Sequence, residues 1–201
     1  YITDERGDMQ LAVNDMAVCN EISPEYLERV LPGIQAGALV LDTNLPVESL
    51  EFICRSSCIP LYADPVSSVK AMKLHGVMKH LRAIKPNALE AAALTGQTDP
   101  ELAARALIDE GVQRVFISLG TNGMIAAEGS RILRMPSPEA NVVNATGAGD
   151  AAMSAIVWAD LHGLSLEDSA RAAQLAGAIT CASEESNAPE LSRLPGLLAA
   201  E

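Results

Sequence analysis

The sequence predicts an α/β protein in which a mostly parallel β-sheet is covered by helices on both faces. Between residues 22 and 111, helical patterns alternate with short aliphatic strand patterns, as in βαβ units. The chain has 201 residues, of which 49% are apolar, and this suffices for the core of one domain. In sheets of this kind, ligands bind beyond the carboxyl ends of the strands.

The first half of the chain supplies the alternating elements. Residues 1–16 hold a polar turn, residues 4–8, between short apolar stretches, which predicts a β-hairpin or a pair of edge strands. The first helix has Ser23 as its N-cap and Pro24 at its first helical position, and Gly96 ends a later one. Helices are expected at residues 23–31, 46–56, 67–77, 87–96 and 99–111, and strands at residues 37–43, 59–64 and 81–86.

The second half has a different pattern. Residues 114–136 contain β-rich runs that are broken at residues 121–123 and 128–130, which predicts a small antiparallel meander. From residue 148 onward the pattern is almost entirely helical, with helices expected at residues 148–163, 165–183 and 189–200.

Charge and hydropathy limit the partners. The net charge of −12 opposes binding to nucleic acids or to anionic membranes, so a small-molecule partner is expected. The 12 residues between Arg171 and Glu184 form one of the longest uncharged stretches and are too few to span a bilayer, so we expect a soluble, cytoplasmic protein. The run from Lys70 to Lys85 holds five of the 14 basic residues and predicts either a local positive patch or a solvated helix face.

A glycine-rich turn, Gly147-Ala148-Gly149, precedes Asp150 and a long helical pattern. The free N–H groups at such a helix start form an anion site. A carboxylate beside that site would repel a bound phosphate. Asp150 is therefore either an ordinary acid that favours the helix dipole or a group that acts on a substrate.

Two functional interpretations compete for this turn. As Gly147-x-Gly149-x-x-Ala152, with Glu167 or Asp168 at a suitable distance, it fits a loose dinucleotide fingerprint and would indicate an oxidoreductase. That fingerprint needs a strand after the helix, however, and the next 40 residues have helical patterns. In the second interpretation Asp150 is a general base, and the N–H groups of the turn hold the charge on a transferred phosphoryl group.

The turn resembles the signature of the ribokinase-like, or PfkB, sugar and nucleoside kinases. Their C-terminal motif reads D-T-x-G-A-G-D-x-F, and "NATGAGDAA" matches it from Thr146 to Asp150. "KPNALEA" resembles the N-x-x-E element of the family, and "SLGTNGM" resembles its T-L-G-x-x-G element. Taken alone, "KPNALEA" is also a helix capping box, and "SLGTNGM" is also a hairpin turn. Their occurrence in the order of the family is specific.

The resemblance implies a ribokinase-like three-layer α/β/α sandwich with a mostly parallel sheet. Residues 1–16 would be a remnant of the small β-clasp lid and residues 17–201 the core, with the N-terminal part of the family fold absent. It also implies an ATP-dependent kinase that uses Mg²⁺. The catalytic residues would be Asp150 as the base and the N–H groups of Gly147, Ala148 and Gly149. The nucleotide would bind at Asn87, Ser118, Gly120, Gly123, Thr146 and Asn187, and the metal at Glu90 and Asn87.

Three stretches, residues 13–16, 64–70 and 186–192, most resemble the bacterial members of this family that act on pseudouridine. The resemblance therefore implies transfer to the 5′-hydroxyl of a ribose-containing nucleoside, with ribose, fructose and adenosine as alternative acceptors. The substrate residues would be Asn14, Asp15, Asp64 and Lys70. The resemblance also implies a homodimer.

One departure from the signature concerns a monovalent cation. Asn144 stands where the family motif has its first aspartate, at a position near the K⁺ site of the family. An amide supplies no formal charge there. We therefore expect weak dependence of the activity on K⁺, or none.

Overall fold

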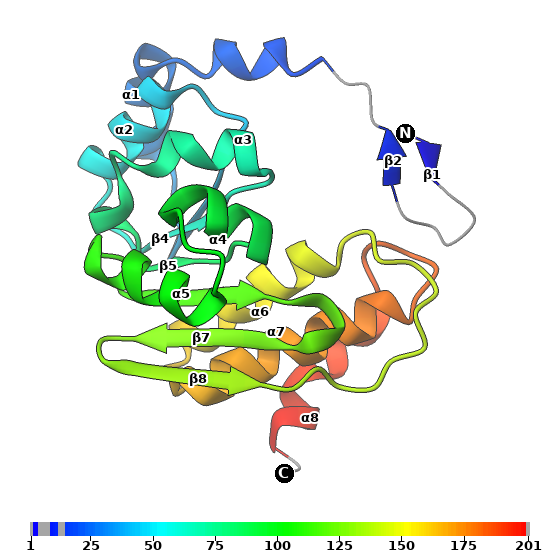
Figure 1. Ribbon diagram of the computed structural model, residues 1–201. Coiled ribbons are helices and arrows are strands. Elements are labelled where there is room, and N and C mark those ends of the chain that lie inside the picture. The colour runs from blue at the N-terminus through cyan, green and yellow to red at the C-terminus, as the bar shows by residue number, and fades with distance from the viewer. Residues whose placement is uncertain (1, 4–8, 12–14, 200–201) are drawn as a thin grey trace.

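The computed structural model of the chain describes residues 2–3, 9–11 and 15–199. Its centre is a six-stranded sheet in the order β3-β4-β5-β6-β7-β8 (Figure 1). The first four strands are parallel: β3 (Leu39–Asp42), β4 (Leu61–Asp64), β5 (Ala83–Ile84) and β6 (Arg114–Ser118). The last two are antiparallel: β7 (Met124–Glu128) and β8 (Arg131–Met135). The predicted α/β class and the predicted meander are confirmed.

Helices cover both faces of the sheet (Figure 1). One layer contains α1 (Pro24–Val30), α2 (Val47–Ser56), α3 (Ser68–Ala71), α4 (Ala88–Thr95) and α5 (Pro100–Asp109). The other contains α6 (Ala148–Leu161) and α7 (Leu166–Cys181), with α8 (Leu194–Ala199) packed on α7. This is the predicted three-layer arrangement.

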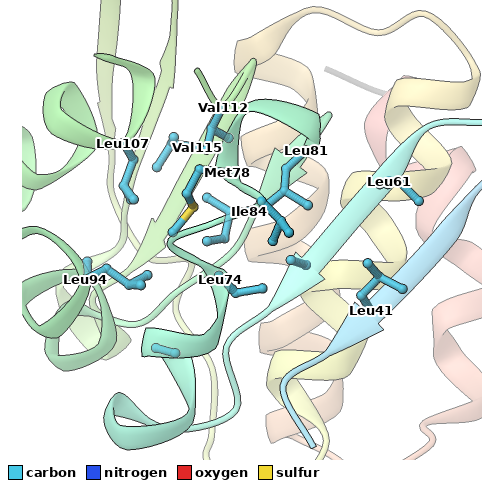
Figure 2. Close-up of a cluster of buried hydrophobic side chains, with 14 of the residues drawn as sticks. Leu41, Leu61, Leu74, Met78, Leu81, Ile84, Leu94, Leu107, Val112 and Val115 are labelled. Atoms are coloured by element: carbon cyan, nitrogen blue, oxygen red, sulfur yellow. The ribbon is translucent and has the colours of Figure 1, made fainter. Parts of the chain in front are cut away.

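Alternation along the strands separates the two core clusters that contact the sheet, because successive side chains of a strand point to opposite faces. Leu61 and Ala63 of β4 belong to the cluster under α1–α5, whereas Tyr62 between them packs with α6 and α7. Figure 2 shows part of the first cluster, in which Leu41, Leu61 and Ile84 of the sheet lie near side chains of the covering segments.

Two predicted helices are interrupted. The pattern over residues 67–77 gives only α3, followed by 3₁₀ turns at Met72–Leu74 and Met78–His80. Gly76 lies inside this stretch, and glycine is costly in a helix interior. The pattern over residues 189–200 gives a 3₁₀ turn, Pro189–Arg193, and then α8. Pro195 cannot donate an N–H inside a continuous helix, so a new helix begins just before it.

Strand β5 is shorter than the predicted strand, residues 81–86, because only Ala83 and Ile84 pair on both sides. Strands β1 (Ile2–Thr3) and β2 (Met9–Leu11) pair antiparallel in a separate two-stranded sheet, as expected for a hairpin. The predicted turn, residues 4–8, lies outside the described residues. The assignment of residues 1–16 to a lid stays a prediction.

A buried charge network fixes the C-terminal end of α6 against the amino-terminal side of the parallel strands. The Asp160 carboxylate, 8% exposed, accepts hydrogen bonds from Tyr62 Oη (2.5 Å) and from Arg82 Nε (2.8 Å), and Arg114 Nη1 lies 3.2 Å away. Burial acts to raise the pKa of Asp160, but the donors Arg82 and Tyr62 outweigh it and lower the pKa. Because α6 is about 20 Å long, its N-terminus lies at the opposite edge of the sheet.

Candidate active site

A cleft of about 920 Å³ lies where the parallel strands end and α6 begins. It brings together many of the residues singled out from the sequence: Asp64, Asn87, Glu90, Ser118, Gly147, Gly149 and Asp150. It also contains residues that sequence reasoning missed: Val40, Leu41, Asp42, Leu45, Val66, Lys85, Met153 and Ser154. Its position at the carboxyl ends of the strands is the expected one for a ligand site.

Gly147 forms the turn that leads into α6. Its φ is +88°, in the left-handed region that glycine adopts without cost. A Cβ atom at this position would lie 2.3 Å from the carbonyl oxygen of Ser186. The turn is therefore packed tightly against the loop that follows α7. Only glycine satisfies both conditions.

The first turn of α6 borders the cleft, and a helix leaves its first amides without intrahelical partners. Gly149 lines the cleft, and Ala148 does not. The Ala148 N–H donates to the carbonyl oxygen of Ala145 at 3.3 Å. Anion binding by Gly147 and Gly149 is compatible with this geometry, and the role of Ala148 stays a prediction.

Asp150 occupies the third position of α6 and is exposed to the cleft. Met153 and Ser154 follow it on the same face at helical spacing and also line the cleft. A carboxylate at this point favours the helix dipole. The same carboxylate is also open to a ligand hydroxyl, as a general base must be.

Asn87 and Glu90 form a capping box at the start of α4. The Asn87 Oδ1 accepts from the Glu90 N–H at 2.9 Å, and the Glu90 Oε2 accepts from the Asn87 N–H at 2.8 Å. Glu90 is only 5% exposed. Burial raises its pKa, and the nearby Asp64 carboxylate raises it further, whereas the Asn87 N–H and Lys85 lower it. The capping interpretation is confirmed, and a carboxyl group is held in the cleft at an energetic cost.

The donors in the cleft fit Mg²⁺. Magnesium prefers oxygen ligands and is usually held by one or two carboxylates together with phosphates and water. Glu90 and Asp64 supply carboxylate oxygens, and Asn87 supplies an amide oxygen. Among the described residues, no group of three or more His, Cys, Asp or Glu is arranged to hold a metal directly. A metal ion in this cleft would therefore be held by the phosphates of a bound nucleotide as much as by the protein.

Lys85 is the most informative residue that the sequence analysis missed. Its side chain is 6% exposed, and its Nζ lies 3.0 Å from Asp64 Oδ2. A Cβ atom on Gly149 would lie 3.6 Å from the same Nζ. A buried cation requires a partner, and Asp64 is that partner. The signal in the sequence is a lysine between a strand and the N-x-x-E element.

The structure brings Asp64 to the cleft but also gives its carboxylate two partners, Lys85 and the Val66 N–H at 3.1 Å. It does not bring Lys70 to the cleft. The Lys70 Nζ donates to Asn44 Oδ1 at 2.6 Å, and the Asn44 amide donates to Asp42 Oδ2 at 2.8 Å. The loop after β3 therefore engages Lys70, and its contact with the substrate stays a prediction.

Four of the five cations in the basic run are engaged by groups of the protein. Lys73 donates to the carbonyl oxygens of Thr43 and Leu45, both at 2.9 Å. Arg82 binds Asp160, and Lys85 binds Asp64. Lys79 is exposed, Lys70 and Lys73 are half-buried against the loop after β3, and Lys85 is buried.

Ser118 ends β6 and lies beside Asn87, with which it forms an isolated parallel bridge. Gly120 and Gly123 flank the following turn but do not line the cleft. Gly123 has φ of +91°, and a Cβ atom there would lie 1.9 Å from the carbonyl oxygen of Met135. Close strand packing alone thus explains this glycine, and the nucleotide role of both glycines stays a prediction.

Three further predicted residues, Thr146, Asn187 and Asp15, lie outside the cleft lining. Thr146 is exposed, and its N–H donates to Asn144 Oδ1 at 2.9 Å. Asn187 is exposed and follows Ser186, the residue against which Gly147 packs. The Asp15 carboxylate is exposed and accepts from the Ala17 N–H at 2.9 Å. Asn14 lies outside the described residues.

The elements that follow α6 test the dinucleotide-binding interpretation. After α6 comes α7, and no strand follows α6 in residues 148–199. The βαβ unit required by the dinucleotide fingerprint is therefore missing, and the oxidoreductase interpretation was wrong. Over the described ranges, no helix is both long and apolar enough to cross a membrane.

The fold and the cleft thus define an α/β protein with a candidate ligand site at the start of α6. A profile of the pfkB family of carbohydrate kinases matches residues 5–193. The chain is 33% identical to pseudouridine kinase of Escherichia coli (strain K12) over 199 residues, which cover 95% of this chain and 64% of the relative. It is 34% identical to the uncharacterized sugar kinase YeiI of the same organism, over 90% of this chain and 52% of that relative.

Solved structures of sugar kinases are similar to this chain in fold. A putative sugar kinase from Clostridium perfringens superposes with a TM-score of 0.82 at 27% identity, over 98% of this chain and 66% of that one. Ribokinase from Thermotoga maritima gives a TM-score of 0.79 at 21% identity, over 90% of this chain and 62% of that one. The chain belongs to the pfkB family of carbohydrate kinases, and its fold is ribokinase-like. It spans 64% and 52% of the lengths of the two curated relatives.

Proposed function

We propose that the protein containing this chain is an ATP-dependent kinase that phosphorylates the 5′-hydroxyl of pseudouridine. The observation that carries the proposal is the position of Asp150. This carboxylate lies in the cleft at the start of α6, directly after the Gly147–Gly149 turn. A base beside an anion-binding turn is what transfer of a phosphoryl group to a hydroxyl requires.

In the proposed mechanism Asp150 accepts the proton of the attacking hydroxyl. The N–H groups at the start of α6, including that of Gly149, stabilise the negative charge on the transferred phosphoryl group. The Lys85 Nζ lies beside Gly149 and adds positive charge in the same place. Glu90 and Asn87 would hold Mg²⁺, which neutralises phosphate charge when bound.

The choice of acceptor is supported by two observations. The chain is 33% identical to a pseudouridine kinase over 95% of its length. Residues 64–70, which resemble the same group of kinases, include Asp64 and Val66 of the cleft. A second candidate keeps the chemistry and changes the acceptor to ribose, fructose or adenosine. The similarity to a ribokinase from Lactococcus lactis, 28% identical over 78% of this chain, supports ribose as the alternative acceptor. The homodimer and the cytoplasmic location stay predictions.

The test is a panel of acceptors given to the intact protein with ATP and Mg²⁺, with phosphorylated products separated by chromatography. The expected result is rapid conversion of pseudouridine to its 5′-phosphate and slow conversion of ribose, fructose and adenosine. Faster turnover of ribose or fructose would replace the acceptor and keep the mechanism. No product from any acceptor would contradict the proposed function.

A further inference from the structure

The loop after β4 contains an unusual backbone conformation at Val66. Its φ of +63° makes it the one non-glycine residue with positive φ in the part of the chain that the structure describes. The Ser67 N–H donates to the carbonyl oxygen of Pro65 at 2.6 Å, which closes a γ-turn around Val66. A γ-turn with positive central φ is strained, and a β-branched residue is poorly suited to it.

The strained turn is held by the walls of the cleft. The Asp64 Oδ1 accepts from the Val66 N–H, and Asp64 is itself held by Lys85. The buried Thr43 hydroxyl donates to the carbonyl oxygen of Pro65. Strain persists only where the surroundings determine the conformation, and it is concentrated at functional sites. The consequence here is that the apolar Val66 side chain lines the cleft and is 45% exposed.

Val66 lies one strand away from Asn87, which follows β5, and further from Ser118, another residue expected to bind the nucleotide. It follows β4, whereas Ser118 ends β6, two strands away in the sheet. Neighbouring strands are about 4.8 Å apart, so the axes of β4 and β6 are separated by about 10 Å. Val40 and Leu45 line the cleft from β3 and the loop after it, so apolar side chains gather on this side.

We propose that Val66 is a specificity-determining residue, whose side chain packs against the planar face of the nucleobase of a nucleoside acceptor. This inference rests on the proposed function. A nucleobase presents two apolar ring faces, whereas a free sugar presents mainly hydroxyl groups. An apolar contact on the acceptor side therefore favours nucleosides over free sugars. The γ-turn keeps this side chain in the cleft.

The test compares Val66→Gly with Val66→Ile in the intact protein. Glycine adopts a φ of +63° readily, so Val66→Gly is expected to fold while losing the contact. Val66→Ile keeps an apolar, β-branched side chain. The control is Val69→Ala, since Val69 is 85% exposed on α3 and lies outside the cleft lining. Binding of pseudouridine and of ribose is measured by calorimetry without ATP, and turnover with ATP is measured in parallel.

Val66→Gly is expected to weaken pseudouridine binding about tenfold and to leave ribose binding nearly unchanged, while Val66→Ile and Val69→Ala keep the wild-type preference. Equal weakening of both acceptors, or an unchanged preference, would overturn the inference and leave the kinase proposal intact. Wild-type protein that binds ribose more tightly than pseudouridine would also overturn it. Wild-type protein that binds neither and turns over neither would overturn both proposals.

Discussion

The packing of the glycine turn before α6 leads to a prediction about Gly147→Ala. A Cβ atom at Gly147 destabilises the folded state in two ways. The left-handed φ of +88° costs about 1 to 2 kcal/mol for a residue with a side chain. The Ser186 carbonyl oxygen, only 2.3 Å away, forces the loop after α7 to shift, and overpacking of this kind costs about 1 to 3 kcal/mol. The expected loss of stability is about 2 to 5 kcal/mol.

Gly163, which follows the C-terminal end of α6, provides a matched control. Its φ is +71°, but nothing lies within 4 Å of an added Cβ atom. Gly163→Ala therefore meets the backbone cost alone, about 1 to 2 kcal/mol. Both substitutions lower the entropy of the unfolded chain to the same extent, so this effect cancels in the comparison. The difference between the variants measures the contact with Ser186.

The assay is urea unfolding followed by circular dichroism, which gives the free energy of unfolding of each variant. Gly147→Ala is expected to be less stable than Gly163→Ala by about 1 to 3 kcal/mol. A difference below about 0.5 kcal/mol, the usual additivity error, would refute the reasoning. In that case the turn would not be held tightly against Ser186.

Two further predictions concern the cleft and its surroundings. Burial raises the pKa of Glu90. The cost of ionising it in the folded state is absent below the unfolded pKa of about 4.3, grows as the pH rises toward the raised pKa and is fully present above it. Glu90→Gln should therefore raise the free energy of unfolding at pH 7 but not near pH 3. It should also lower turnover about 10- to 100-fold. A variant that is less stable than wild type at pH 7 would contradict the stability prediction. The Asn144 Oδ1 accepts a hydrogen bond from the Thr146 N–H, and the amide supplies no formal charge for a cation. Replacing Na⁺ by K⁺ at constant ionic strength should therefore change turnover less than about twofold. A steep rise in turnover with K⁺ would contradict this prediction.

Local sequence patterns predicted the parts of the site that depend on local structure. The capping box of Asn87 and Glu90 and the glycine turn before Asp150 each use residues within a few positions of one another. The order of strands and helices followed from periodicity for the same reason. The mechanism of the site, by contrast, rests on pairs that are far apart in the sequence.

The rest could not be predicted because it depends on how the strands are placed side by side. The pairing of Lys85 with Asp64 requires β4 and β5 to be parallel neighbours. Valine rarely adopts positive φ, so no sequence pattern indicates the γ-turn at Val66. The hydrogen bond from Lys70 to Asn44 joins α3 to the loop after β3, and no local pattern in the sequence indicates it.

The most direct test of the account is the activity of Asp150→Asn. Asparagine keeps the shape of the side chain and suits a helix start nearly as well, so the stability should change by less than about 1 kcal/mol. It cannot accept the proton of a substrate hydroxyl, so kcat with pseudouridine and ATP should fall about 10²- to 10⁴-fold. The affinity for ATP should stay the same or increase, because a negative charge leaves the phosphate region. A kcat within about threefold of wild type would contradict the central claim that Asp150 is the catalytic base.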